Sequence, residues 1–393
     1  MKLNKIYIVT DAPIPIGMAP TNRILSYANG FLANGIACEI IIFRKTENTV
    51  KITNNKSAGT INGFNFQYLF KSPIKSKYFL KRRIDNLYGA LRLLFFVIFY
   101  IKSSSAIIYY SSYNYAIFIL KIAKLFHSFI LIKEESEHPE VYLRSQNLIS
   151  KFFSTKVHYH LFDGYLLMTQ NLIKYFNSQY PKIPSVHIKM TVDLERFSLK
   201  RMKDSKSLTY IGYLNNEKDG VDILLDAFSK ITHKYPEYIL ALYGEAASNA
   251  NSLEYYINIA ETLGIPKNKI IFYGKFDNIY IPQILANSKL VLLARPNNIQ
   301  AENAFPTKLG EYLASSTPVV VTAVGEIPNY LKDGKSAFIA KPGDSENFAN
   351  KIEEALSDYE NALQVGINGR RVAETHFNNK IQTVKIIKFI QEF

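Results

Sequence analysis

The sequence has a single cysteine, no glycine-rich fingerprint of the form GxGxxG, and none of the patterns typical of a nucleic-acid-binding module. With Cys38 alone, an internal disulfide and a zinc site built from thiolates are both excluded. The lack of a helix-turn-helix, a zinc finger or an aromatic-basic RNA motif argues against nucleic acid as a partner. The amino-terminal residues MKLNKIYIVTDAP contain only a short apolar run. They predict a first strand and not a secretion signal, so we expect a cytoplasmic protein.

The apolar stretch from Leu87 to Ile101 is shorter than the roughly 20 residues that a membrane-spanning helix needs, and it contains Arg92. We therefore do not expect it to span a membrane. Five of its apolar residues recur at helical spacing, which favours a helix that faces the core. These residues are Leu87, Leu91, Leu94, Ile98 and Ile101.

Positive charge is concentrated in one half of the chain. The 393 residues have 48% hydrophobic content, enough for two globular domains, and carry a net charge of +14. Residues 1–200 hold 26 Lys and Arg against 11 Asp and Glu, while residues 201–393 hold 21 against 22. A basic cluster in residues 71–83 leads directly into the apolar stretch. This combination leaves open an alternative in which the protein rests on an anionic membrane, at the inner face of the cell membrane.

Short apolar strands alternate with helical patterns along the whole chain. The expected strands cover residues 5–10, 36–43, 106–112 and 129–135 in the first half, and 208–214, 238–244, 269–275, 289–295 and 318–322 in the second. Strands that are apolar without alternation indicate parallel sheets covered on both faces. The sequence therefore predicts an α/β protein with two doubly wound sheets.

Ligands bind such sheets at the carboxyl ends of the strands, which makes the residues there candidates for a site. Gly17 lies in the loop after the first strand, although a turn glycine is an equal interpretation. Glu137 and His138 follow the strand at 129–135, where an exposed polar loop is the alternative. Lys218 follows the strand at 208–214 and precedes a helix, a position where a cation can meet a diphosphate; a surface lysine is the alternative.

The segment NAFPTKLGEYLASSTPVVVT, residues 303–322, contains a loop, a helix start and a buried strand. We predict a helix beginning near Phe305 or Pro306, because proline suits a first helical turn. Its unpaired amides, together with Lys308, suit a phosphate, and Glu311 one turn further can accept hydrogen bonds from ribose hydroxyls. An ordinary amphipathic helix is the alternative.

The run F-P-T-K-L-G-E-Y-L-A-x-x-x-P-V-V, from Phe305 to Val320, resembles the donor-site signature of the retaining, family-four glycosyltransferases, particularly the bacterial polysaccharide-building branch. That resemblance implies the GT-B fold, with two Rossmann-like domains facing a central cleft. It implies an acceptor domain at residues 1–190, a linker at 191–206, a nucleotide-sugar donor domain at 207–376, and a final helix at 377–393 that crosses back to the first domain.

The resemblance also assigns residues. The implied catalytic residues are His138, Glu137 and Lys218, and Arg23 lies on the acceptor side. The implied donor-binding residues are Gly17, Gly212, Lys218, Tyr273, Gly274, Arg295, Asn303, Phe305, Pro306, Thr307, Lys308, Leu309 and Glu311. The chain departs from the family pattern at Asn303, where a second acidic residue is common, and at Tyr213, where an arginine is common.

The implied activity is a retaining hexosyl transfer from a nucleoside-diphosphate sugar to a glycan, in particular a lipid-linked one, in cell-surface polysaccharide synthesis. It needs no metal and no cofactor besides the donor substrate. Two alternatives remain open: a nucleotide-sugar epimerase, which needs acid and base groups in the cleft, and a catalytically silent scaffold at the membrane surface.

Overall fold

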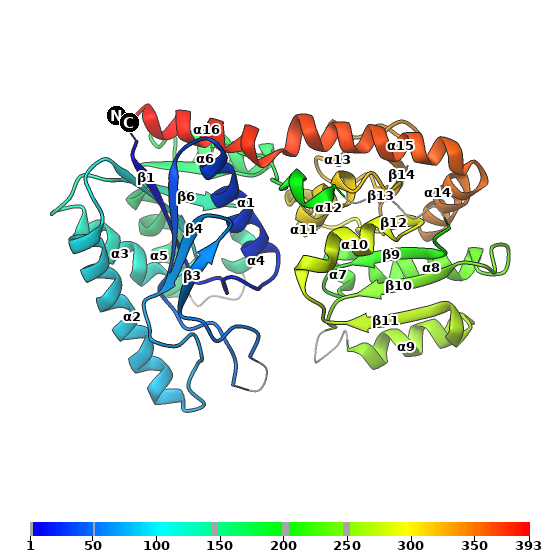
Figure 1. Ribbon diagram of the computed structural model, residues 1–393, viewed down its shortest axis with the longest axis horizontal. Coiled ribbons are helices and arrows are strands. Elements are labelled where there is room, and N and C mark those ends of the chain that lie inside the picture. Colours follow the sequence, from blue (N-terminus) through cyan, green and yellow to red (C-terminus); the bar gives the residue numbers. More distant parts are fainter. Residues whose placement is uncertain (1–2, 50–51, 144–147, 199–203, 247–251) are drawn as a thin grey trace. The chain divides into compact units, whose positions relative to one another are not determined.

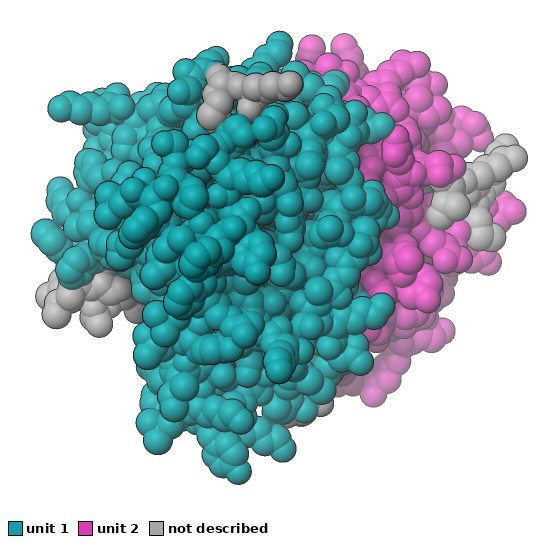
Figure 2. Space-filling view, turned by 60° about the vertical axis from the view of Figure 1, so that its left-hand side comes forward, with its two compact units in different colours: residues 1–191, 379–393 teal, residues 192–378 magenta. Residues whose placement is uncertain are grey.

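The computed structural model describes residues 3–49, 52–143, 148–198, 204–246 and 252–393 (Figure 1). The chain divides into two compact units (Figure 2). The first contains residues Met1–Thr191 and Asn379–Phe393, and the second contains residues Val192–Asn378. The residues predicted as a linker, as far as they are described, fall almost wholly within the second unit.

The first unit is built on an eight-stranded sheet with the strand order β3-β4-β2-β1-β5-β6-β7-β8. All neighbouring strands are parallel except β3 and β4, which form a hairpin. Its turn, Asn62 and Gly63, has positive φ at both residues, as a two-residue hairpin turn requires. The strands are β1 (Lys5–Thr10), β2 (Ala37–Ile42), β3 (Ala58–Ile61), β4 (Phe64–Tyr68), β5 (Ser105–Tyr110), β6 (Ile130–Glu135), β7 (Gly164–Leu167) and β8 (Ser185–His187).

Helices cover both faces of this sheet. Ile6 and Ile8 of β1 pack in one cluster with residues of α1 and α16, whereas Tyr7, on the opposite face, packs edge-on against Phe96 of α2. The final helix, α16, thus completes the core of the first unit. The helices of this unit are α1 (Ala19–Ala33), α2 (Phe79–Tyr100), α3 (Asn114–Ala123), α4 (Pro139–Leu143), α5 (Leu148–Phe153), η1 (Ser154–His158), η2 (Tyr159–Leu161), α6 (Gln170–Gln179) and α16 (Asn379–Gln391).

The orientation predicted for α2 is only partly correct: Ile101 is buried, and Leu94 and Ile98 are half-buried. Leu87 and Leu91, expected to face the core, are 65% and 49% exposed. The helix instead buries Gly89, Ala90, Leu93, Phe96 and Val97. Because α2 is apolar on opposite sides, helical spacing alone defines more than one apolar stripe, and the sequence does not tell which of them meets the sheet.

The second unit contains a six-stranded, fully parallel sheet with the order β11-β10-β9-β12-β13-β14. The strands are β9 (Ser207–Ile211), β10 (Ile239–Tyr243), β11 (Ile270–Gly274), β12 (Leu290–Leu293), β13 (Val319–Thr322) and β14 (Phe338–Ala340). The helices are η3 (Leu194–Phe197), α7 (Asn216–Asp219), α8 (Val221–Ile231), α9 (Leu253–Thr262), η4 (Lys267–Lys269), η5 (Asn278–Tyr280), α10 (Ile281–Ala286), α11 (Ile299–Asn303), α12 (Thr307–Ala314), α13 (Ile327–Tyr330), α14 (Ser345–Ser357), α15 (Tyr359–Val372) and η6 (Ala373–Phe377). The doubly wound architecture predicted for both halves is present in each unit.

Candidate functional site

The start of α12 lies beside the carboxyl end of β9. The helix begins at Thr307, and Pro306 occupies the N-cap position with extended backbone. The first amides of a helix have no acceptor within the helix, so Thr307 and Lys308 present N–H groups at its positive end. The Tyr312 hydroxyl holds the helix in place, because it donates to the carbonyl of Ile211 and accepts from the Ile211 N–H, both at 2.8 Å.

Replacing Tyr312 by phenylalanine removes both bonds and leaves a buried Ile211 N–H without its partner. We expect the free energy of unfolding to fall by about 1–3 kcal/mol, measured by urea denaturation. Tyr280→Phe, at a half-exposed ring of the same unit, is the control and should change stability by less than about 0.5 kcal/mol. Equal stability of the two variants would contradict this role of Tyr312.

Lys308 is the centre of a polar network that the sequence did not reveal. Its Nζ lies 2.6 Å from Asp219 Oδ2 and 3.0 Å from the Tyr210 hydroxyl, and Tyr210 also donates to Asp219 at 3.0 Å. Gly212 has φ of +156°, which residues with a side chain rarely adopt, and a Cβ there would also displace the Lys308 amine. An ammonium has three N–H donors, so this arrangement uses two and leaves one for a ligand.

Cations outnumber anions around this network. Burial, together with the charges of Lys218 and Arg295, lowers the pKa of Lys308 in spite of its contact with Asp219. Burial alone would raise the pKa of Asp219, but Lys308 and Arg295 hold it below 3.8. Lys308 and Arg295 act on the Asp219 carboxylate, and Lys218 adds a further positive charge near Lys308, so this part of the site favours an anionic ligand.

Arg295 connects two backbone segments next to this cluster. Its side chain is fully buried; Nε donates to the Lys218 carbonyl at 3.1 Å, and an Nη donates to the Ala304 carbonyl at 2.9 Å. It therefore ties the segment carrying Lys218 to the loop before α12. Arg295 was expected to bind the donor directly. In the structure its side chain has no exposed surface and contacts backbone carbonyls, so a direct contact with the donor stays a prediction. The side chain of Lys218 is itself half-buried.

Glu311 is held by an arginine from η3. Arg196 Nη1 lies 2.9 Å from Glu311 Oε1, and its other terminal nitrogen donates to the Asn278 carbonyl at 2.9 Å. Burial raises the pKa of Glu311 above 4.5, and Arg196 offsets part of that rise. The contact occupies one carboxylate oxygen and leaves the other as an acceptor for a ligand hydroxyl. Sequence reasoning missed Arg196, which lies 115 positions from Glu311.

The raised pKa of Glu311 gives a pH-dependent prediction. Only the ionised carboxylate accepts hydrogen bonds with both oxygens, so nucleotide affinity should fall as the pH drops through this pKa. The loss should begin at a higher pH than for an exposed glutamate. Isothermal titration with UDP between pH 4 and 8 measures it, and Glu311→Gln should remove this step from the profile. An unchanged step in Glu311→Gln would exclude Glu311 as its source.

Tyr273 and Gly274, predicted to hold a nucleotide base, end strand β11. The Tyr273 ring is 48% exposed and stacks on Tyr243, with ring centroids 4.2 Å apart and planes 2° from parallel. Gly274 has φ of +67° and accepts a hydrogen bond from the Gly244 N–H at 2.9 Å. The stacked rings of Tyr243 and Tyr273 present a flat aromatic surface beside the Gly274 backbone, an arrangement that suits a planar base.

Two further donor-site predictions need correction in their detail. Phe305 is buried and packs against Tyr330 and Phe377, and Leu309 is fully buried. The side chains of Phe305 and Leu309 thus anchor α12 in the core and do not face a ligand. Asn303 donates from its side chain to the Ile299 carbonyl at 2.9 Å, at the end of α11.

Arg23, predicted on the acceptor side, is a buried structural residue. Its Nε lies 2.5 Å from Glu134 Oε1, and its terminal nitrogens donate to the carbonyls of Ile188 and Lys189. Both side chains of the ion pair are 1% exposed. Arg23 therefore ties α1 to β6 and to the segment after β8, and the prediction that it contacts the acceptor is corrected.

Glu137 and His138 lie beyond the end of β6 and are half-buried. The His138 ring packs edge-on against Tyr175 of α6, with centroids 4.5 Å apart. Burial lowers the pKa of His138 below 6.5, so the imidazole is neutral at pH 7. Its Nδ1 accepts from the Glu140 N–H at 3.4 Å, which makes Nε2 the donor. His158, in contrast, lies in η1 and is buried among aromatic rings, and this burial lowers its pKa to about 3.

Asp11 is a candidate that sequence reasoning missed. It directly follows β1, where the sheet order changes direction between β1 and β5. The Ser111 hydroxyl donates to it, and Arg44 and Lys133 place positive charge nearby, although burial raises its pKa above 3.8. The Arg44 guanidinium lies 3.8 Å from the Tyr113 ring centre. Gly17, in the same loop, has no room for a side chain, because a Cβ would overlap Thr21.

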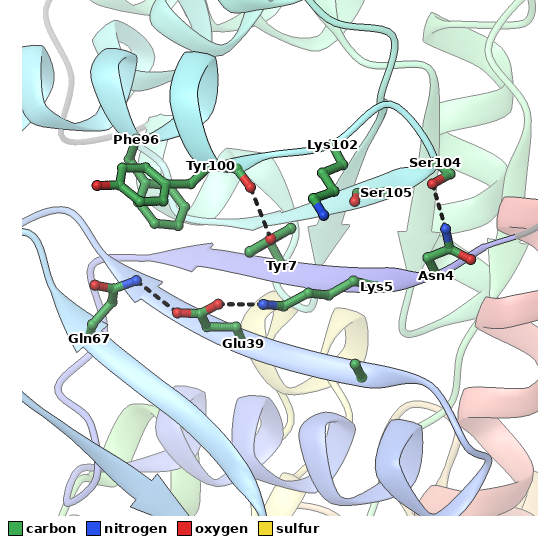
Figure 3. Close-up of a pocket in the computed structure, with 11 residues that line it drawn as sticks. Asn4, Lys5, Tyr7, Glu39, Gln67, Phe96, Tyr100, Lys102, Ser104 and Ser105 are labelled. Carbon is green, nitrogen blue, oxygen red and sulfur yellow. Dashed lines mark hydrogen bonds and ion pairs between the residues drawn. The ribbon is translucent and has the colours of Figure 1, made fainter.

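A cavity of about 490 Å³ lies at the other end of these strands (Figure 3). It is lined by residues at the amino ends of β1, β2 and β5 and by the carboxyl end of α2. Lys5 is paired there with Glu39 at 2.6 Å. Its position at the amino ends of these strands separates it from Asp11 and Gly17, which follow the carboxyl end of β1. Among the residues that the structure describes, no group of three or more His, Cys, Asp or Glu side chains is placed to hold a metal ion.

Residues 191–372, almost the whole second unit, match the family model of group 1 glycosyl transferases. The match is to this segment, which is less than half of the chain. The prediction of the GT-B fold is confirmed by the solved structures described next. The N-acetyl-alpha-D-glucosaminyl L-malate synthase of Bacillus anthracis is 26% identical over 178 residues, which cover 45% of this chain and 43% of that protein. The D-inositol 3-phosphate glycosyltransferase of Corynebacterium aurimucosum is 23% identical over 222 residues, covering 50% and 48%. The chain thus spans about half the length of the curated relatives it matches.

Solved structures match over nearly the full length. Sucrose-phosphate synthase from Thermosynechococcus elongatus superposes with a TM-score of 0.75 at 15% identity, over 99% of this chain and 98% of that one. The Anabaena protein HepE, in complex with UDP and glucose, superposes with a TM-score of 0.72 at 15% identity, over 99% and 100%. At these identities the likeness establishes the fold.

Proposed function

We propose that the chain is a glycosyltransferase that moves a sugar from a nucleoside-diphosphate sugar to an acceptor hydroxyl. The observation that carries the proposal is the excess of cationic groups, Lys218 and Lys308 with the α12 amides, next to the buried carboxylate of Glu311. The cations suit a diphosphate, and the carboxylate suits a ribose. UDP in the structure of HepE supports a nucleotide-sugar donor.

In this proposal the donor's bond from the anomeric carbon to the diphosphate oxygen breaks, and a bond from that carbon to the acceptor oxygen forms. The acceptor's proton leaves with the nucleoside diphosphate. Lys218, Lys308 and the α12 amides stabilise the negative charge that develops on the diphosphate. Glu311 orients the ribose, and the Tyr243–Tyr273 pair supports the base. From the resemblance to family-four enzymes, we further propose that the reaction retains the configuration at the anomeric carbon and needs no metal ion.

The acceptor side belongs to the first unit. We assign His138 and Glu137 to the hydroxyls of the transferred sugar or the acceptor, with Asp11 and Arg44 as further polar contacts. A glycan acceptor fits these groups, because carboxylates, imidazole and guanidinium all bond hydroxyls. We further propose that the acceptor glycan is lipid-linked and that the reaction serves cell-surface polysaccharide synthesis. The protein would then lie at the surface of the membrane.

The experiment that tests it is a thermal-shift screen against UDP-, GDP- and other nucleotide sugars, followed by product analysis. A donor that binds the native state raises its stability, and product should form only when an acceptor is added. Conversion of the donor to an isomer without acceptor would indicate an epimerase. No stabilisation by any nucleotide sugar would remove the proposal, and product analysis gives the stereochemistry. Full activity in EDTA is expected.

A further inference from the structure

Helix α2 (cyan in Figure 1) presents apolar side chains on two opposite sides. One side meets the core of the first unit. The other carries large apolar residues that are between 44% and 74% exposed, here called the outer stripe. At 3.6 residues per turn they fall within an arc of roughly 120° that is centred opposite the buried residues. The outer stripe consists of Leu80, Ile84, Leu87, Tyr88, Leu91, Phe95 and Phe99.

The neighbouring helix also exposes large apolar side chains. α3 packs beside α2, and it exposes Phe118 and Ile122 one turn apart. The residues just after it, Leu125 and Phe126, are 82% and 63% exposed. Soluble monomers rarely expose so many large apolar side chains on adjacent elements, so this face is expected to be covered by a partner.

Basic side chains beside the outer stripe indicate which kind of partner covers it. The segment before the outer stripe and the first turn of α2 expose five basic side chains: Lys71, Lys77, Lys81, Arg82 and Arg83. The acidic residue of α2, Asp85, is paired with Lys45 at 3.0 Å. Within the outer stripe itself, Tyr88 alone carries a polar side-chain atom. Protein interfaces need many hydrogen-bonding groups, whereas a bilayer needs an apolar face bordered by cations.

We propose that α2 lies in the plane of an anionic lipid bilayer, with the outer stripe in the acyl region and the basic residues on the lipid head groups. No helix among the described residues is long and apolar enough to cross a membrane, so the attachment is to one leaflet. This proposal names the surface of the protein that would contact the membrane. It does not depend on the donor site. Vesicle binding therefore tests it separately from sugar transfer.

The first test is flotation of the full chain with vesicles of phosphatidylcholine containing 30% phosphatidylglycerol. The variant Leu87→Gln/Leu91→Gln/Phe95→Gln should bind about 100-fold more weakly, because three large side chains lose their apolar environment. Ile381→Gln, on α16 of the same unit and 43% exposed, is the matched control and should bind as the unaltered chain does. Phosphatidylcholine alone should bind the unaltered chain at least tenfold more weakly.

The second test uses the absence of tryptophan from the sequence. Phe95→Trp places a single fluorophore in the outer stripe, and Tyr280→Trp places one at a half-exposed position of the second unit. Vesicles should shift the emission of the first to shorter wavelength and leave the second unchanged. Equal shifts, an unshifted Phe95→Trp, or vesicle binding that survives the triple substitution would overturn the proposal. So would self-association of the chain in solution that the triple substitution abolishes, because a second copy would then cover the stripe.

Discussion

Replacing Lys218 by alanine is expected to lower kcat/KM for sugar transfer by about 100- to 1,000-fold, the range typical of losing one group that stabilises charge in the transition state. The physical reason is that Lys218 adds positive charge near Lys308, where the departing diphosphate would gain negative charge. The loss should appear mainly in kcat, since negative charge builds up on the leaving group as the bond breaks.

The matched control is Lys267→Ala, a surface lysine of the same unit whose side chain is 87% exposed. It should leave kcat/KM unchanged. If Lys218→Ala and Lys267→Ala behaved alike, Lys218 would be an ordinary surface lysine, and the site would have to be placed elsewhere. Urea denaturation of both variants separates a catalytic loss from a folding defect.

Asp219→Asn is expected to lower the free energy of unfolding by about 3 kcal/mol, because it leaves the Lys308 ammonium beside two other cations without its carboxylate. Glu237→Gln, at an exposed residue of the same unit, should change it by less than about 0.5 kcal/mol. The free energy of unfolding of the unaltered chain should also depend on pH through Asp219. The pKa of Asp219 is lower in the folded chain, so its contribution is complete above its unfolded value near 3.8 and is lost as the pH falls through the folded pKa.

The same variant tests whether the cluster binds an anion. A diphosphate would replace the lost negative charge, so UDP should raise the melting temperature of Asp219→Asn by more than it raises that of the unaltered chain. The comparison is made at equal UDP concentrations. A smaller shift in the variant would mean that Asp219 supports the ligand directly and that the excess positive charge is not what binds it.

Much of the fold could be predicted because its signals are local. The apolar runs at residues 5–10 and 289–295 indicate strands by themselves, and the structure has β1 at Lys5–Thr10 and β12 at Leu290–Leu293. The start of α12 was placed within two residues from Pro306 alone. The hairpin of β3 and β4 also has a local signal, the Asn62-Gly63 turn between alternating apolar residues, but it was not among the predicted elements.

What the sequence could not provide is the set of tertiary partners. Glu311 was expected near a ribose, but Arg196, which fixes its position, is distant in the chain. Asp219, the partner of Lys308, is 89 positions away. Arg23 and Arg295 match the family pattern, yet only coordinates reveal that both are buried and act by holding backbone carbonyls. For α2, two apolar stripes on one helix made the choice of buried side undecidable without the sheet.

The most direct test of the donor site is a crystal structure of the chain with UDP. The account predicts diphosphate oxygens within hydrogen-bond distance of Lys218 Nζ and the amides of Thr307 and Lys308, ribose hydroxyls on Glu311, and the base against Tyr273. A diphosphate bound instead in the cavity beside Lys5, or a ribose that leaves Glu311 untouched, would contradict it.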